Sequence, residues 1–482
     1  EVASSSSSDV ILVNGNAALS GTTLRVVPTD ENSLSYGDRH TILVASGGIS
    51  GQFDAIEVPQ QFRGRLLNSG NTGTLLLAPD TYTRVATTPN ERSAATALDS
   101  FIPTTSGDRL AISIALDSLT EEEYPNAFEQ VSPAIYANLP LILVEQAYNQ
   151  AQLISQRLGF VRAGVGGGFQ FAGVAEPELR YDRNGKSVID PKTLIPLPQE
   201  AAVANWNAWV MGTGQFSNSN GWAGVPSGRN NAGGFLAGVD YQWTDEFATG
   251  VFGGFQYNQA NYTGGGFAKG SGVTFGVYGT YSNDTGWYAD GVIGGGYTAI
   301  QTRRTITFGT IDRSTDADPG AGQFNISLNL GKDWTAGNLR FGPVAGLQYT
   351  YASTSSFTEQ GADSLDLAVS SFGTNSLRST LGARAAYLWD LNEKLTLVPE
   401  LRALWMHEFL NGGETLSSSL DGGRGASFDY ETGSTYADSL FAGAGLGLKI
   451  GDQITASLFY NINFGGDSFI NNIISTDVNV AF

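Results

Sequence analysis

The chain has 482 residues, a formal net charge of −20 at pH 7 and no cysteine. Its length predicts two or three domains, because a single domain usually holds about 100–200 residues. The negative charge argues against a nucleic-acid partner, since binding to phosphate requires a positive surface. The lack of cysteine excludes disulfides and thiolate metal sites.

The first part of the chain, residues 1–118, consists of short strand-like runs between Gly, Asn, Asp and Ser turns. The clearest runs lie at residues 10–13, 23–27, 40–45 and 74–77. Such short strands are typical of the end of a β-solenoid or of a sandwich, and a general all-β domain explains them equally well. We therefore expect a β-rich first domain.

Residues 119–204 change to a helical pattern. Thr120 and Glu123 form the T-x-x-E signature of a capping box, which predicts that a helix begins there. Apolar residues recur at helical spacing over residues 141–158. The remainder is a linker rich in Gly and Pro that ends in a second, shorter helical candidate at residues 198–205. We expect a helical linker over this whole region.

From residue 205 to residue 482, long segments alternate apolar and polar residues. In one of them Phe324, Ile326 and Leu328 point to one face and Asn325 to the other. The segments hold about ten to fifteen residues, whereas strands of soluble sandwiches usually hold about 5–6. Membrane strands need about 9–11 tilted residues, apolar toward lipid and polar toward the lumen. No apolar run reaches the roughly 18 residues of a spanning helix, so the pattern predicts a transmembrane β-barrel.

The alternating region predicts twelve antiparallel strands joined by connections that are short and long in turn. Short periplasmic turns and long external loops are typical of outer-membrane barrels. Because twelve is even, both ends of the barrel chain lie on the periplasmic side. The segments begin near residues 205, 231, 247, 270, 286, 321, 338, 375, 394, 436, 453 and 470. The long connections lie at residues 217–230, 262–269, 303–320, 353–374 and 411–435, and a brief one follows at 465–468.

This even strand number bears on the route of the chain. If residues 1–118 are to lie outside the cell, the segment before the first strand must run through the lumen. A helix suits that passage because it satisfies its own backbone hydrogen bonds. Either 141–158 or 198–205 fits, and the alternative is that both helices pack outside the barrel in the periplasm.

The alternation also predicts which charged side chains face the lumen. They are Asp240, Arg378, Arg384, Glu400 and Arg402. Charges in a lumen can be solvated or can pair across the barrel. The functional alternative is that these residues hold the lumen helix.

The last strand ends in a C-terminal aromatic residue, with Val478, Val480 and Phe482 on one face. Such alternation up to a terminal Phe is the pattern that the outer-membrane assembly machinery recognises. We therefore interpret these three residues as the assembly signal.

Enzymatic chemistry finds little support in the sequence. The chain has two histidines, His40 and His407, and no G-x-S-x-G elbow of a serine hydrolase. A run of glycines at residues 164–168 lacks the Lys-Ser/Thr of a phosphate-binding loop. We expect no catalytic residue, no cofactor and no metal.

Several stretches, taken together and in order, resemble the autotransporter family. NWNAWVMGTGQF, SLRSTLGARAAYLWD and LTLVPELRALWMHEFLNG resemble strands of the autotransporter β-domain. ALDSLTEEEYPNAFEQVSPAIYANL resembles the helical leader of that barrel, and YGDRHTILVASGGISGQFD resembles the last rungs of a passenger solenoid. The resemblance covers residues 20–160 and 205–482.

The resemblance implies a type V secretion translocator, mostly β, with a twelve-stranded barrel, a lumenal helix and the end of a solenoid passenger. Its partners would be outer-membrane lipid, the barrel assembly machinery and its own passenger, which it would anchor at the cell surface. Residues 20–118 would then template passenger folding, as an autochaperone does. Some members cleave their passenger inside the barrel, but no residue here is assigned to that reaction.

Two other functions remain as alternatives. One is an outer-membrane porin or solute channel with a periplasmic N-terminal domain, which would need neither a helical leader nor a solenoid. The other is an outer-membrane protease or esterase, which the two histidines disfavour.

Overall fold

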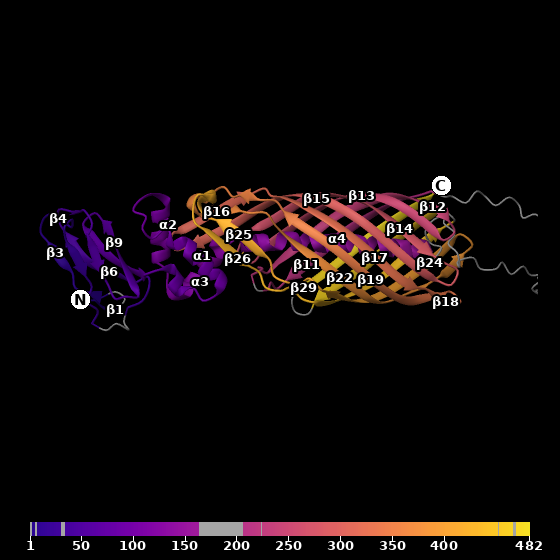
Figure 1. Cartoon of the computed structure of the whole chain (residues 1–482), viewed down its shortest axis with the longest axis horizontal. Helices are drawn as coiled ribbons and strands as arrows, with labels where there is room; N and C mark the ends of the chain where they lie inside the picture. Colours follow the sequence, from indigo (N-terminus) through magenta and orange to yellow (C-terminus); the bar gives the residue numbers. More distant parts are fainter. Residues whose placement is uncertain are drawn as a thin grey trace, which may run out of the picture.

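The computed structural model describes residues 2–4, 7–29, 34–162, 206–222, 224–451, 453–465 and 469–482. The molecule is elongated, and three parts follow one another along its axis (Figure 1). Small sheets lie at the N-terminal end, a group of short helices lies in the middle, and a barrel forms the other half. The C-terminus lies at the far end of the barrel from the helices.

Twelve long antiparallel strands form the barrel within the described residues, which confirms the predicted number. Each strand pairs with the next along the chain, and β29 pairs with β11 to close the cylinder. The strands are β11 (Trp206–Ser219), β12 (Gly228–Thr244), β13 (Phe247–Tyr262), β14 (Phe267–Ser282), β15 (Trp287–Phe308), β17 (Gly320–Lys332), β19 (Leu339–Thr354), β22 (Phe372–Tyr387), β24 (Leu395–Glu408), β27 (Asp438–Ile450), β28 (Ile454–Gly465) and β29 (Phe469–Ala481). Short strands β18 (Trp334–Ala336) and β23 (Trp389–Asn392) extend two of the hairpins.

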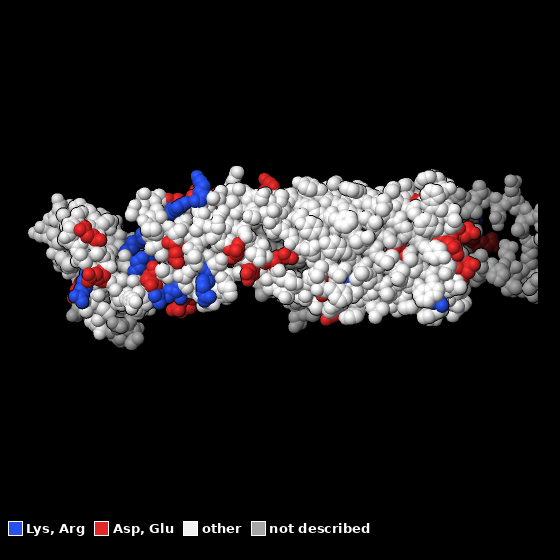
Figure 2. All heavy atoms as spheres, in the orientation of Figure 1, with Lys and Arg blue, Asp and Glu red and all other residues white. Residues whose placement is uncertain are grey.

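Side chains alternate across the barrel wall as predicted. In β17, Phe324 is 47% exposed on the outside, and its neighbour Asn325 is 4% exposed inside. On the face shown in Figure 2 the middle of the barrel carries few charged atoms, whereas acidic residues gather at the end farthest from the helices. An uncharged outer band between charged ends matches the hydrocarbon layer of a membrane.

The two ends of the barrel differ. We call the end with short hairpins the turn end and the other the loop end. Loop 3 joins β15 to β17 and contains β16 (Ile311–Ala317), which pairs with an extension of β15. Loop 4 joins β19 to β22, and loop 5 joins β24 to β27.

Loops 4 and 5 carry secondary structure of their own that the sequence did not predict. Together they build a four-stranded sheet in the order β20-β21-β25-β26. Its strands are β20 (Phe357–Thr358), β21 (Ala368–Val369), β25 (Thr415–Ser419) and β26 (Ser427–Glu431), with short 3-10 turns η6 (Asp363–Leu365) and η7 (Asp421–Gly423).

The N-terminal sheets contain short strands, several of which stack in parallel. The parallel pairs are β3 with β6, β4 with β7, and β5 with β8. In all three the partners are 32 residues apart in sequence, since Ile11 pairs with Leu43, Ala17 with Ile49 and Thr23 with Ala55. β9 and β10 then form an antiparallel hairpin next to β6. The strands are β1 (Val2–Ser4), β2 (Ser7–Ser8), β3 (Ile11–Val13), β4 (Ala17–Ala18), β5 (Thr23–Arg25), β6 (Arg39–Ala45), β7 (Ile49–Ser50), β8 (Ala55–Glu57), β9 (Phe62–Ser69) and β10 (Thr72–Pro79).

The expectation of strands up to residue 118 is wrong beyond β10. After the 3-10 turn η2 (Tyr82–Val85), the chain forms two helices, α1 (Pro89–Asp99) and α2 (Gly107–Asp117). Thr88 and Glu91 form a complete capping box at the start of α1, and Pro89 occupies its first turn. The physical reason is therefore a local helix-start signal that outweighs the turn-rich composition around it.

The predicted helix start at Thr120 and Glu123 is confirmed, because both capping-box bonds are present. The 3-10 turn η3 (Glu121–Glu123) leads into α3 (Tyr124–Val131), and η4 (Ala134–Ala137) leads into the long helix α4 (Asn138–Phe160). α4 lies inside the barrel (Figure 1). The helical pattern at 141–158 is thus the lumen helix of the described structure, and the alternative that it packs outside the barrel is wrong. The second candidate, 198–205, lies outside the described residues.

Candidate functional site

The candidate site is the barrel lumen with α4 inside it. The N-terminal end of α4 lies among the loops, since Asn138 lines the same cavity as Thr432 and Thr435 of loop 5. Its C-terminal end lies near the turns, where Phe160 packs edge-on against Phe459 with ring centroids 5.0 Å apart. The chain therefore runs from the loop end to the turn end, which is also where β11 begins.

α4 is buried on all sides but is not apolar on all sides. Leu153, Ile154 and Leu158 pack against an apolar cluster on the inner wall. The other faces bury polar side chains, which must find partners in the wall because an unpaired buried polar group is costly. These buried polar residues are Gln146, Asn149, Gln152, Gln156 and Arg157.

Arg157 makes the most enclosed of these contacts. Its guanidinium forms an ion pair of 2.7 Å with Asp240, and the two side chains are 1% and 2% exposed. It also donates to Asn479 at 2.7 Å and lies over the ring of Trp209. The hydroxyl of Tyr278 donates to Asp240 at 2.6 Å. This network ties α4 to four strands of the wall, β11, β12, β14 and β29.

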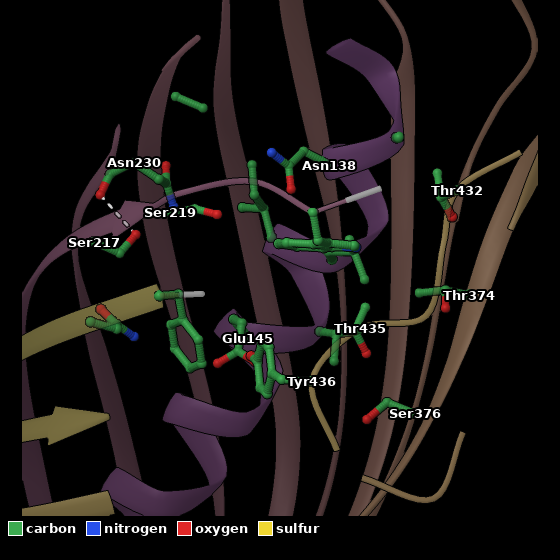
Figure 3. Close-up of a pocket in the computed structure, with 18 of the residues that line it drawn as sticks. Asn138, Glu145, Ser217, Ser219, Asn230, Thr374, Ser376, Thr432, Thr435 and Tyr436 are labelled. Atoms are coloured by element: carbon green, nitrogen blue, oxygen red, sulfur yellow. Dashed lines mark hydrogen bonds between the residues drawn. The ribbon is translucent and has the colours of Figure 1, made fainter. Parts of the chain in front are cut away.

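A second cluster lies nearer the loop end. Arg378 forms an ion pair of 2.8 Å with Glu145 of α4 and a longer one of 3.4 Å with Glu408 of the wall. The guanidinium also lies over the ring of Tyr148. Tyr436 donates its hydroxyl to Glu145 at 3.2 Å, and Figure 3 shows these two side chains beside each other.

A cavity of about 120 Å³ lies beside this cluster, between α4 and the wall. Figure 3 shows that its polar lining comes from both sides, with Asn138 on the helix and Ser217 and Asn230 on the strands across from it. Trp222 and Tyr262 add apolar surface. The lumen is therefore filled incompletely at its loop end.

The remaining predicted residues lie closer to the turn end. Arg402 donates to the side-chain oxygen of Gln156 at 2.7 Å. Arg384 pairs with Asp333 of the wall. A Cβ atom on Gly159 would lie 2.1 Å from the Arg384 guanidinium, so the helix backbone and the arginine touch there.

Glu400 is buried and lines a small cavity together with Gly159, Phe160 and Arg384. All five charged residues that the alternation placed in the lumen thus lie around α4. Asp240, Arg378 and Arg402 contact its side chains directly.

Sequence reasoning missed an equivalent contact at the turn end. Arg162, just past α4, pairs with Asp290 and donates to Thr280 at 2.9 Å. Arg340 donates to the Arg162 carbonyl at 3.2 Å. The alternation pattern does place Asp290 inside, but nothing local to it reveals a partner 128 residues away in sequence.

The residues interpreted as an assembly signal lie on the outer face of β29. Val478 and Val480 are both exposed there, and Phe482 is 63% exposed. The Phe482 amide donates to the Trp206 carbonyl at 3.0 Å, so the last residue lies at the closing seam of the barrel. Their role in assembly stays a prediction.

The two histidines lie in different parts of the molecule. His40 is buried in the N-terminal sheets. His407 lies at the loop end of the barrel, where its Nδ1 is 2.9 Å from a carboxylate oxygen of Asp438. Within the described ranges, no group of three or more His, Cys, Asp or Glu side chains could hold a metal ion. No helix in the described part of the chain is long and apolar enough to cross a membrane.

Comparison with known proteins gives matches to the barrel and to most of the chain. The family model described as the autotransporter β-domain matches residues 208–461. Two curated relatives from Serratia marcescens, both named extracellular serine protease, are 22% and 23% identical over 90% and 95% of this chain. These matches cover 42% and 45% of the relatives, so the chain spans less than half of their length.

Among solved structures, the barrel is similar to autotransporter domains. The translocator domain of NalP from Neisseria meningitidis matches with a TM-score of 0.47 and 14% identity, over 58% of this chain and 89% of that one. The β domain of the Bordetella autotransporter BrkA matches with a TM-score of 0.43 and 18% identity, over 58% of this chain and all of that one.

Proposed function

The chain belongs to the autotransporter family, and we propose that its barrel delivers residues 2–137 to the outer face of the outer membrane and holds them there through α4. The family places the barrel in the outer membrane and implies a passenger of its own, and we assign the N-terminal residues to that passenger. The surface position of those residues is the step that we add.

One observation carries this proposal: α4 threads the lumen with residues 2–137 on the loop side. In outer-membrane barrels the long loops face the outside and the short turns face the periplasm. The helices α1 to α3 pack among loops 3 to 5, and the N-terminal sheets lie beyond them (Figure 1). A periplasmic N-terminal domain would instead lie at the turn end.

We propose further that the lumen residues hold α4 in place after export. Asp240, Arg378 and Arg402 bind α4 side chains, and Arg384 and Glu400 surround its C-terminal end. A lumen filled in this way argues against the alternative of an open porin, which needs a continuous water path.

The N-terminal sheets support the interpretation of residues 1–118 as the end of a passenger. A constant spacing of 32 residues between parallel partners means that one coil of chain stacks on the next. Such stacking supports our assignment of these sheets to the end of a solenoid, in which each repeat contacts only its neighbours. We assign residues 119–204 to the linker and residues 205–482 to the translocator.

The residues of this chain serve secretion and anchoring rather than catalysis. The relatives are named proteases, but the matched region is less than half of their length. The partners that we propose are outer-membrane lipid and the assembly machinery. Lipid would contact the uncharged outer band of the barrel, and the assembly machinery would bind the terminal strand with Val478, Val480 and Phe482.

The proposal is tested by protease accessibility on intact cells. An epitope is inserted at the exposed turn between β9 and β10, next to Gly70. We expect external protease to remove the epitope while the barrel survives and changes its gel mobility on heating. If the epitope is protected until the outer membrane is broken, residues 2–137 are periplasmic and the proposal is wrong.

A further inference from the structure

The helices outside the lumen and loops 3 to 5 share one hydrophobic core. From residues 82–137 come Tyr82, Phe101 and Phe128, each fully buried. From the other side come Ile306 of the β15 extension and Leu416 of loop 5, which are fully buried in the same cluster. α1 packs directly on β26, so the sheet of loops 4 and 5 has the helices as the cover of its apolar face. Neither side would have a closed core alone.

Polar contacts cross this interface at several separate places. Asn90 of α1 exchanges two hydrogen bonds with the Glu431 backbone of loop 5, of 2.7 and 2.8 Å. Arg109 of α2 pairs with Asp421 of loop 5 at 2.7 Å. Such reciprocal and charge-assisted bonds fix orientation as well as adding attraction.

Asp108 links α2 to two further loops. It accepts from Arg313 of loop 3 at 3.1 Å and from the Ser364 amide of loop 4 at 3.0 Å. One carboxylate therefore joins α2 to both loops. Within the described residues, Asp108, Arg313 and Ser364 contact one another and not α4, so this contact does not depend on α4.

A buried charge cluster completes the interface. Arg304, in β15 at the loop end, pairs with Glu359 of loop 4, and both side chains are almost fully buried. Arg304 also donates to the Gln130 carbonyl of α3 at 2.6 Å. The Tyr136 hydroxyl donates to Glu359. A buried pair of this kind is stable only when its remaining hydrogen bonds are satisfied. Here the helical segment supplies the Gln130 carbonyl and the Tyr136 hydroxyl, and loop 4 supplies the Leu365 carbonyl and the Leu367 amide.

From these contacts we propose that loops 3 to 5 form a docking platform that holds residues 82–137 non-covalently. The residues upstream then stay on the barrel even when the chain is cut between them and α4. The occupant of the platform is this chain's own helical segment, which the shared core and the complementary charges identify. The inference rests on the proposed function only for its location at the cell surface.

The test uses the purified full-length protein in detergent, with a site for a specific protease inserted between Glu121 and Glu122. Both residues are exposed and lie between α2 and α3. A cut there places Asn90, Asp108 and Arg109 on the N-terminal fragment and the loops on the barrel fragment. Complete cleavage is checked on a denaturing gel, and the sample is then run on a sizing column.

We expect the two fragments to elute together. Separation of the fragments after complete cleavage would overturn the inference. The variant N90A/D108A should raise the dissociated fraction by roughly tenfold or more, since it removes hydrogen bonds to three loops. Glu57→Ala is the matched control, because it removes an exposed carboxylate of the N-terminal sheets, and it should leave co-elution unchanged. Equal dissociation in both variants would also contradict the inference.

The same protein on cells separates this inference from the proposed function. If the inserted site is cut only after the outer membrane is broken, the surface location is wrong, whatever the column shows. If the site is cut on intact cells and the N-terminal fragment is released into the medium, the surface location stands and the docking platform is wrong.

Discussion

Replacing Asp240 by Ala tests the claim that the lumen contacts hold α4. The Arg157–Asp240 pair spans 2.7 Å, which at an effective dielectric constant of about 20 gives a Coulomb attraction of about 6 kcal/mol. Desolvation of two buried ions offsets most of this. Removal of Asp240 nevertheless leaves Arg157 buried without its ion-pair partner and with only the more distant Asp477 carboxylate to offset its charge, which costs about 3–5 kcal/mol.

A cost of that size has a visible consequence for the lumen. Since about 1.4 kcal/mol is a factor of ten in an equilibrium, 3–5 kcal/mol raises the fraction of molecules with α4 undocked by more than about 100-fold. Undocking opens the barrel. We therefore expect Asp240→Ala to show frequent large-conductance events in a planar lipid bilayer, and we expect the original protein to show almost none.

A double variant makes the interpretation specific. Replacement of both partners, D240A/R157L, removes the unpaired charge. It should make large-conductance events rarer than in Asp240→Ala, because a buried ion pair can often be replaced by apolar groups. Asp245→Ala, in an exposed turn, is the matched control. The reasoning is refuted if Asp240→Ala conducts as little as the original protein. It is also refuted if the conductance effects of Asp240→Ala and of Arg157→Leu, each measured alone, simply add in the double variant.

Three further predictions concern other parts of the chain. Gly159→Leu places side-chain atoms where the Arg384 guanidinium lies. We therefore expect opening events in the bilayer assay, though fewer than with Asp240→Ala. A conductance equal to that of the original protein would contradict this prediction. Burial lowers the pKa of His40, although the Asp38 carboxylate acts in the opposite direction. The neutral form is thus favoured in the folded state, and stability of the N-terminal sheets should be full above about pH 6.5 and fall below it as the unfolded chain takes up a proton. Thermal unfolding followed by circular dichroism at pH 7.5 and 5.5 checks this, and His40→Leu should remove the difference between the two pH values. Deletion of residues 478–482 should abolish barrel insertion, measured as loss of the heat-modifiable band in outer membranes, and normal insertion would refute the assembly-signal interpretation.

The barrel could be predicted because its signal is long and repetitive. Twelve segments with a period of two fix both the strand number and the side of the wall on which each residue lies. The lumen position of Asp240 and Glu400 follows from that phase alone. Their relation to α4 does not, because the rotation and height of a helix inside a barrel depend on contacts between segments far apart in sequence.

The region outside the barrel was predicted less well, for a local and a non-local reason. Thr88 and Glu91 carry the same capping signature as Thr120 and Glu123. The start of α1 could therefore be predicted from the sequence, but the turn-rich composition around it favoured strands and turns in our prediction. The sheet of loops 4 and 5 could not be predicted from the sequence. Its strands have two to five residues and are stabilised by the helices that cover them.

The charges on α4 and just past its end give the lumen helix a defined axial position. Its polar faces are mostly uncharged amides, which can exchange partners as a helix slides. The ion pairs are few and lie at different heights: Glu145 with Arg378 near the loops, Arg157 with Asp240 farther in, and Arg162 with Asp290 at the turns. A shift by one helical turn moves each side chain by about 5.4 Å, which breaks all three pairs together and leaves their charges buried. The apolar contacts alone would tolerate such a shift far better, so the ion pairs set the axial position of α4 in the lumen.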